Sequence, residues 1–273
     1  MFTSGKRLVK SGFSAFGLDI HKKRPEQPVT LHRASLSGAL RQLSALGFKP
    51  KTVIDVGVAT QTSELYEEFK DCNLLLIEPL VEFEPFLRKI CGSYKAQYVL
   101  AAAGEVPGSA TINVHPDKFG SSMLKEVEGA LVDGTPREVP VVTIDRVCSE
   151  RNLEGPYLIK VDVQGAELHV LCGATSTLLE TEAVILEVTL FGTMIGGPQL
   201  FDIVHWMKNA GFVVYDIWGF SYRPLDNALA QVDLAFVREA GAFRQYHGYA
   251  TPDWRKERIQ SLEPFLAQLG KQP

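Results

Sequence analysis

Four carboxylates close predicted buried strands of this sequence, and their types and spacing are those that could do chemistry. Asp55, Glu78, Asp162 and Glu187 each end a run of apolar residues typical of strands in a parallel sheet. The carboxyl ends of parallel strands meet at one edge, where ligands bind in open α/β folds. Like charges gathered there cost stability, so several carboxylates at one edge indicate a functional site more than helix capping.

The spacing between Gly57 and Glu78 indicates a nucleoside site. Glu78 lies 21 residues after Gly57, the interval at which nucleotide-binding α/β folds place an acid that accepts hydrogen bonds from two ribose hydroxyls. The turn after VIDVG lacks the second and third glycines of G-x-G-x-x-G. A pyrophosphate needs those glycines because it packs against the backbone. S-adenosylmethionine has no pyrophosphate, so the turn favours this cofactor over a dinucleotide.

The elements that position these residues alternate along the chain. Apolar runs predict strands at residues 52–57, 73–80, 96–104, 156–165, 182–191, 213–220 and 231–239. Segments between them predict helices at residues 36–46, 63–69, 81–91, 166–179 and 198–212. The pattern predicts an α/β fold with a mostly parallel sheet, helices on both faces, and an antiparallel pair at one edge.

The alternation is interrupted between Glu105 and Glu138. Turn residues there surround a short alternating strand around Ala110–Val114, which predicts an inserted hairpin arm, and residues 139–148 resume the alternation. No Pro/Gly/Ser linker divides the chain. We therefore expect a basic leader (1–33), one main domain (34–240, with the insertion at 105–138) and a helical C-terminal tail (241–273).

Charge and composition exclude few function classes. The net charge is -4, with seven Lys/Arg and two acidic residues in positions 1–33, which leaves 21 basic and 30 acidic residues elsewhere. This balance argues against nucleic-acid binding. The four cysteines form no C-x-x-C pair, so neither zinc nor disulfides are expected. No apolar run is long enough for a membrane span, and we expect a cytoplasmic protein. The basic leader is the one candidate for peripheral contact with an anionic membrane, unless it packs on its own domain or forms a loose tail.

The segment LIKVDVQGAELHVLCGA (158–174) resembles the most specific motif of the FkbM family of S-adenosylmethionine-dependent methyltransferases. In that motif a strand ending K-I-D-V-E-G-A-E runs into a helix that finishes L-x-G-A. The segments VIDVG, LLLIEPLVEFEPF, GSSML, VPVVTID, VILEV and QVDLAFV stand around it in family order, over about residues 50–238. The resemblance implies a Rossmann-like class I methyltransferase fold with a seven-stranded sheet, S-adenosylmethionine as cofactor, and O-methylation of a sugar, glycan or other hydroxylated acceptor.

The resemblance also implies cofactor-binding residues. Asp55 and Gly57 would border the methionine part of S-adenosylmethionine, and Glu78, followed by Pro79, would bind the ribose. Ser122, with its neighbour Ser121, matches a serine pair expected to face the cofactor or the acceptor.

Two carboxylates are the catalytic candidates. An alcohol must lose a proton when it is methylated, and a carboxylate within hydrogen-bond reach can accept it. Asp162 is the first candidate, although it could instead cap the helix that begins near Gly165. Glu187 would line the acceptor side. The two could also approach each other as Mg²⁺ ligands, but spacing does not establish this and we predict no metal. His115, in the insertion, is a further acceptor-site candidate, whereas Glu167 and Asp145 are expected to be structural.

Two alternatives remain open from the sequence. One is an NAD-linked oxidoreductase on a Rossmann sheet, against which the missing glycines count. The other is a non-catalytic binding module with a methyltransferase fold. Gln61 keeps the second alternative open, because similar family members carry the last glycine of the turn at this position.

Overall fold

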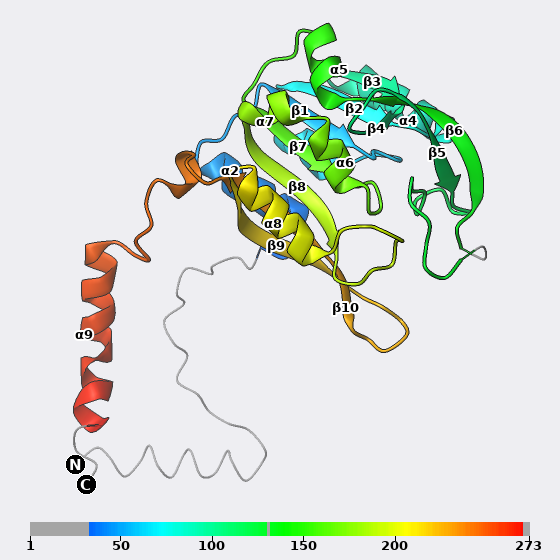
Figure 1. The fold of residues 1–273 in the computed structure, drawn as a ribbon. Helices are drawn as coiled ribbons and strands as arrows, with labels where there is room; N and C mark the ends of the chain where they lie inside the picture. The colour runs from blue at the N-terminus through cyan, green and yellow to red at the C-terminus, as the bar shows by residue number, and fades with distance from the viewer. Residues whose placement is uncertain (1–32, 130–131, 270–273) are drawn as a thin grey trace, which may run out of the picture. The chain divides into compact units, whose positions relative to one another are not determined.

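The computed structural model describes residues 33–129 and 132–269, and a seven-stranded sheet lies at its centre (Figure 1). The strand order is β3-β2-β1-β7-β8-β10-β9. The strands are β1 (Thr52–Val56), β2 (Asn73–Glu78), β3 (Ala96–Leu100), β7 (Tyr157–Val161), β8 (Thr181–Thr189), β9 (Phe212–Tyr222) and β10 (Leu229–Arg238). β10 pairs antiparallel with β8 and β9, and the other neighbours pair parallel. The predicted mostly parallel sheet with an antiparallel pair at its edge is confirmed.

Helices cover both faces of this sheet. On one face lie α2 (Leu36–Ala45), α3 (Ser63–Glu68) and α4 (Glu84–Ser93), and on the other α5 (Ile144–Glu150), α6 (Glu167–Cys172), α7 (Thr175–Leu179) and α8 (Leu200–Asn209). Alternate side chains of β1 enter the two cores: Val53 packs with the first group of helices, and Ile54 and Val56 with the second. This alternation explains why continuous apolar runs form the central strands.

A second, three-stranded sheet contains the predicted hairpin arm. β5 (Gly108–Val114) and β6 (Thr135–Val142) pair antiparallel, and β4 (Ala102–Ala103) pairs with β6. The buried face of the hairpin packs on Leu80 and Phe83, which follow β2. The insertion therefore lies beside the carboxyl edge of the main sheet, where the strand-end carboxylates are.

Three predicted elements were wrong in their bounds. Residues 96–104 divide into β3 and β4, which belong to different sheets. Residues 139–148 do not resume the parallel alternation but form the end of β6 and α5. In β6, Val139 and Val141 are buried while Glu138 and Pro140 are exposed, which is the pattern of an antiparallel strand with one solvent face.

The single helix predicted at residues 166–179 is two helices, α6 and α7. The chain between them packs closely on the second sheet. A Cβ added at Gly173 would lie only 2.0 Å from the carbonyl oxygen of Gly104. Asp145 accepts hydrogen bonds from the backbone N–H groups of Ser176 (2.9 Å) and Thr177 (2.7 Å) in α7. This contact supports the structural role expected of Asp145.

The C-terminal segment contains the helix expected there, α9 (Pro252–Leu269), after a short 3-10 turn at Ala242–Arg244. The basic leader lies outside the described residues, apart from Arg33, whose side chain pairs with Asp216. Across the described parts of the chain, no helix has the length and apolarity needed to cross a membrane.

Candidate active site

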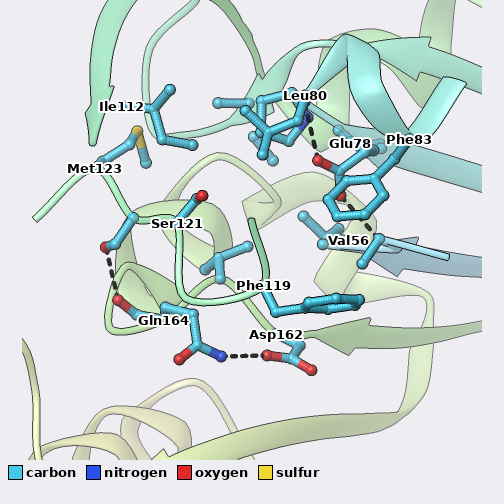
Figure 2. Close-up of a pocket in the computed structure, with 18 of the residues that line it drawn as sticks. Val56, Glu78, Leu80, Phe83, Ile112, Phe119, Ser121, Met123, Asp162 and Gln164 are labelled. Carbon is cyan, nitrogen blue, oxygen red and sulfur yellow. Dashed lines mark hydrogen bonds between the residues drawn. The ribbon is translucent and has the colours of Figure 1, made fainter. Parts of the chain in front are cut away.

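A pocket opens where the carboxyl ends of β1, β2, β7 and β8 face the hairpin arm (Figure 2). It encloses about 820 Å³, including the space at its open mouth. The walls include Gly57, Ala59, Glu78, Pro79, Leu80, Phe83, Phe119, Ser121, Ser122, Asp162, Gln164 and Glu187. Of the seven residues predicted to be catalytic or cofactor-binding, six line this pocket, and Asp55 does not.

Gly57 brings the turn after β1 against β7. Its φ is +77°, a conformation that other residues rarely adopt. A Cβ at this position would lie 1.8 Å from the carbonyl oxygen of Asp162. The backbone N–H of Asp162 donates to Val56 O (3.0 Å), and that of Gly57 donates to Ile77 O (2.9 Å). The three strand ends are therefore held together by backbone contacts that leave no room for a side chain.

We expect Gly57→Ala to destabilise the fold by roughly 3 kcal/mol or more, because the added methyl group meets a backbone atom and the positive φ is strained. The matched control is Gly47→Ala. Gly47 has a φ of +91°, but nothing lies within 4 Å of its added Cβ, so we expect only the conformational cost of about 1–2 kcal/mol. Urea denaturation measures both. Equal losses in the two variants would contradict the close approach to Asp162.

Glu78 is buried at the base of the pocket, with 4% of its surface exposed. Its Oε2 accepts a hydrogen bond from the Ala59 N–H and its Oε1 from the Leu80 N–H, each at 2.9 Å. Burial raises the pKa of this carboxyl, an effect that these hydrogen bonds oppose. Each carboxylate oxygen has a second lone pair. Glu78 can therefore still accept hydrogen bonds from the two hydroxyls of a ribose.

Gln61 does not enter this pocket. Its side chain is exposed and lines a separate surface depression with Thr60, Phe86 and Lys89. The position of the missing glycine is therefore outside the space available to a cofactor. Ala59, which does line the pocket, adopts a φ of +46°, so the backbone keeps a left-handed turn there without a glycine.

Asp55 lies behind the pocket wall and is fully buried. Its Oδ2 accepts a hydrogen bond from the Tyr66 hydroxyl (2.6 Å), and its Oδ1 lies 3.5 Å from Lys160 Nζ. Burial alone would lower the pKa of Lys160, but the negative charges of Asp55 and Asp162 outweigh it and raise that pKa. Asp55 therefore holds Lys160 as a cation beneath the site, rather than bordering the pocket as predicted.

Asp162 and Glu187 are brought together at the rim of the pocket. The side-chain amide of Gln164 donates to Asp162 Oδ1 and to Glu187 Oε2, each at 2.9 Å. Burial, and then the negative charge of Asp162, raise the pKa of Glu187 to about 8. Burial and Asp162 also raise the pKa of Asp233, on β10, to about 6. These carboxylates form an acidic cluster beside Lys160, and they favour a shared proton.

The serine pair fixes the loop that covers the pocket. Ser122 is buried, and its hydroxyl donates to Gln164 O (2.7 Å) and accepts from Leu124 N–H (3.0 Å). The hydroxyl of Ser121 accepts from His115 N–H (3.0 Å). Both serines line the pocket as predicted, but their hydroxyls are engaged by the protein itself.

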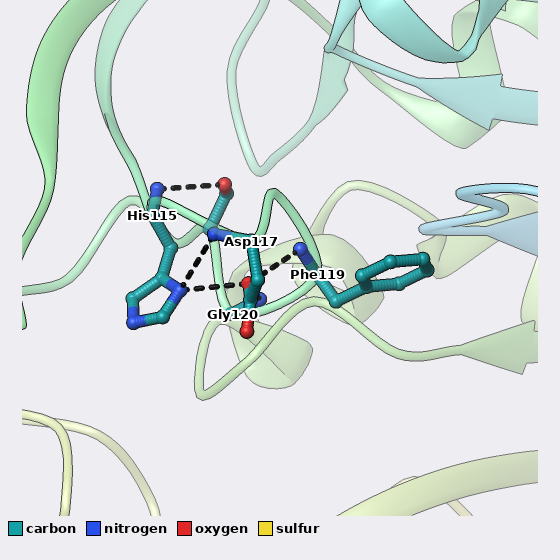
Figure 3. A network of polar contacts seen from close by, with 5 residues as sticks. His115, Asp117, Phe119 and Gly120 are labelled. Atoms are coloured by element: carbon teal, nitrogen blue, oxygen red, sulfur yellow. Dashed lines mark hydrogen bonds and ion pairs between the residues drawn. The ribbon is translucent and has the colours of Figure 1, made fainter.

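His115 belongs to a loop network instead of the pocket (Figure 3). Its Nδ1 lies 2.7 Å from Asp117 Oδ1, and the same oxygen accepts hydrogen bonds from the N–H groups of Phe119 (2.9 Å) and Gly120 (3.1 Å). This network fixes the backbone at Phe119, whose ring centroid lies 5.5 Å from that of Phe83. The two rings form an apolar wall of the pocket.

The buried state of Glu187 predicts a pH-dependent stability. Because its folded pKa is raised to about 8, the folded protein holds this proton more tightly than the unfolded chain, where the pKa is about 4.3. The wild type therefore loses stability as the pH rises from about 4.3 to about 8. We expect Glu187→Gln to be more stable than the wild type by about 1 kcal/mol or more at pH ~9, and by less at pH ~5. Thermal unfolding at the two pH values measures this, and an equal difference at both would contradict it.

Sequence reasoning missed Gln164 and Lys160. The sequence held a signal for Gln164: residues 158–174 resemble a motif that has Glu at this position, so Gln164 is a departure from the motif beside Asp162. In the described ranges 33–129 and 132–269, no cluster of three or more His, Cys, Asp or Glu side chains is arranged to hold a metal ion.

The chain has a Rossmann-like class I methyltransferase fold, with a glycine turn after β1 and an acid at the end of β2. The methyltransferase FkbM domain matches residues 55–214, and the chain belongs to this family. Methyltransferases of this family use S-adenosylmethionine, which is therefore the cofactor of this protein.

Solved structures of several methyltransferases are similar to this chain at low identity. Precorrin-6y C5,15-methyltransferase from Geobacter metallireducens has 12% identity and a TM-score of 0.41, over 78% of this chain and 92% of that one. Magnesium protoporphyrin IX methyltransferase from Synechocystis, with bound S-adenosylmethionine, has 11% identity and a TM-score of 0.41, over 85% and 96%. A putative RNA methyltransferase from Pyrococcus horikoshii has 15% identity and a TM-score of 0.38, over 85% and 98%. A comparison with curated proteins found no match.

The residues present fit S-adenosylmethionine. Glu78 offers free acceptor sites at the buried end of the pocket, and the backbone of Gly57 lines the pocket. Leu80, Phe83 and Phe119 supply the apolar walls that an adenine ring needs.

Proposed function

We propose that this protein transfers the methyl group of S-adenosylmethionine to a hydroxyl oxygen of a sugar, a glycan or another hydroxylated acceptor. The observation that carries the proposal is the pair of carboxylates, Asp162 and Glu187, joined by Gln164 at the pocket rim. An alcohol is a poor nucleophile until it loses its proton, and a carboxylate pair at the reacting edge can accept it.

In this proposal the protein positions the cofactor and removes water. Glu78 accepts hydrogen bonds from the ribose, the backbone at Gly57 lies against the methionine part, and Phe83 and Phe119 enclose the adenine. S-adenosylmethionine supplies a methyl group on a positively charged sulfur, which is already activated for displacement. The main task of the protein is then to hold the acceptor oxygen in line and to accept its proton.

The carboxylate pair acts as the base. A group with a pKa near the working pH is the most effective proton acceptor, and the pKa of Glu187 is raised to about 8. This favours Glu187 as the group that accepts the proton of the acceptor hydroxyl, whereas Asp162, the first candidate from the sequence, keeps that pKa high through its negative charge.

A smaller pocket supports a neutral, hydroxyl-bearing acceptor. It measures about 280 Å³, including the space at its open mouth, and shares Gln164 and Glu187 with the main pocket. Its other lining residues are Gly165, Glu167, Thr189, Thr193, Met194 and Gln231. Thr189, Thr193 and Gln231 are uncharged side chains that hydrogen-bond hydroxyl groups, and none of the described lining residues is Lys or Arg. Among the described residues that line this smaller pocket, none could pair with a phosphate on the acceptor.

The test uses mass spectrometry. Metabolite and glycan extracts from cells that lack the gene are incubated with the purified protein and S-adenosylmethionine that carries a deuterated methyl group. We expect the label on an ether oxygen of a hydroxylated compound, and the unlabelled form of the same product in wild-type cells. Label that appears only on nitrogen, or only on nucleic acid or protein, would contradict the proposal.

A further inference from the structure

Gln164 joins the two candidate catalytic carboxylates through a single amide group. Its Nε2 lies 2.9 Å from Asp162 Oδ1 and 2.9 Å from Glu187 Oε2 (Figure 2 shows the first of these contacts). A primary amide nitrogen has two N–H donors, so both are used. The two carboxylates come from different strands, β7 with its following loop and β8. β7 and β8 are paired neighbours, with Val161 opposite Leu186 directly before these two residues, so the sheet brings the two backbones together and the amide connects their side chains.

The backbone fixes the position of Gln164 independently of these contacts. Its φ is +55°, and its carbonyl oxygen accepts the hydrogen bond from the Ser122 hydroxyl at 2.7 Å. The loop from the hairpin arm thus anchors the turn from outside. A side chain of similar length at this position would start from the same place and point toward the same two carboxylates.

The charges around Glu187 explain why a neutral donor suits this position. Asp162 faces it from the loop after β7, Asp233 from β10, and Glu167 from the start of α6, whereas Lys160 on β7 is the cation nearby. Three acidic neighbours and one lysine already leave the cluster negative. A further carboxylate would increase the repulsion, while an amide lowers it by donating to both ions.

We propose that Gln164 is a positioning residue that holds the carboxylates of Asp162 and Glu187 together as one proton-accepting pair. The amide does not react. It sets the separation of the two carboxylates and stabilises their charged forms by hydrogen bonds, so that the pair can take up a proton from the acceptor hydroxyl and release it afterwards. This role rests on the proposed function of the pair as the base. The two hydrogen bonds from Gln164 are present without cofactor or acceptor.

Two variants separate donation from packing. Gln164→Met keeps the length of the side chain and its lack of charge but removes both N–H donors. Gln164→Glu keeps the shape, removes the donors and adds a negative charge. If Gln164 only packs, Gln164→Met should leave the titration of Glu187 unchanged. If it positions the pair, the pKa of Glu187 should rise in both variants, and further in Gln164→Glu.

The experiment is an NMR titration of the full-length protein with ¹³C-labelled Asp and Glu carboxyl groups, without cofactor or acceptor. Glu187→Gln identifies the resonance of Glu187 by its loss. We expect an increase in the pKa of Glu187 of roughly 0.5–1 unit in Gln164→Met and of about 1 unit or more in Gln164→Glu. An unchanged pKa of Glu187 in Gln164→Met would overturn the proposal whatever Gln164→Glu does, because the added charge of Gln164→Glu raises that pKa with or without the lost donors. If the protein transfers no methyl group to a hydroxyl, the proposed function fails, but this titration still decides the role of Gln164.

Discussion

Glu78→Ala is expected to weaken S-adenosylmethionine binding by about 100-fold or more. The variant loses two charged hydrogen-bond acceptors for the ribose, and such hydrogen bonds contribute roughly 1.5–3 kcal/mol each. It also leaves the Ala59 and Leu80 N–H groups without their partner, which loosens the turns on both sides of the cofactor. Isothermal titration calorimetry measures the loss.

The controls for Glu78→Ala separate binding from folding. Glu84→Ala removes a nearby glutamate that pairs with Arg88 and Tyr98 and does not line the pocket, so its affinity should remain within about twofold of the wild type. Glu78→Gln keeps one acceptor oxygen and should lie between the two. Thermal unfolding verifies that each variant is folded at the titration temperature. Unchanged affinity in Glu78→Ala would show that the ribose binds elsewhere.

Glu187→Gln is expected to lower turnover by about 100-fold or more, because positioned proton transfer contributes roughly 10²–10⁴-fold to such reactions. Asp162→Asn should also lower turnover, and the double variant should lose little more than the stronger single one, because the two groups act as a unit. S-adenosylmethionine affinity should change by only a few-fold in each. Transfer of a labelled methyl group to the acceptor fraction measures turnover.

The pKa of Glu187 sets the direction in which the turnover rate should change with pH. The base must be ionised, so the wild-type rate at saturating cofactor should rise with pH and level off above the pKa of Glu187, near 8 in the free protein. Asp162→Asn removes a negative charge that raises this pKa, so the rise should move to lower pH in that variant. Turnover at the wild-type level in Glu187→Gln would remove this residue as the base, and an unmoved profile in Asp162→Asn would contradict the coupling.

The sequence predicted the sheet well because its central strands are buried on both faces. The runs at Val53–Val56 and Leu74–Ile77 have no exposed side. They can therefore be recognised as strands from the local sequence, without knowledge of distant contacts. The second sheet was harder to predict, because β6 alternates and its partners lie across a long loop. The break at Gly173 was also hidden, since it results from packing against Gly104.

The sequence predicted which residues form the site better than it predicted what each of them does. Asp55 could have been placed from strand periodicity alone. It shares a face of β1 with Val53, which packs under α2 and α3, and it pairs in register with Lys160 on β7. Its side chain therefore points into the core rather than over the sheet edge. Gln164 could not be placed in this way, because its contacts depend on a left-handed turn and on a residue of the next strand.

Calorimetric titration of the full-length protein with S-adenosylmethionine, S-adenosylhomocysteine and NAD tests whether the pocket at Glu78 binds S-adenosylmethionine. We expect saturable one-site binding of the first two ligands, lost in Glu78→Ala, and no binding of NAD, because Ala59 and the residues after it lack the glycines that a pyrophosphate requires. Absence of binding by both sulfur ligands, or binding of NAD in their place, would contradict it.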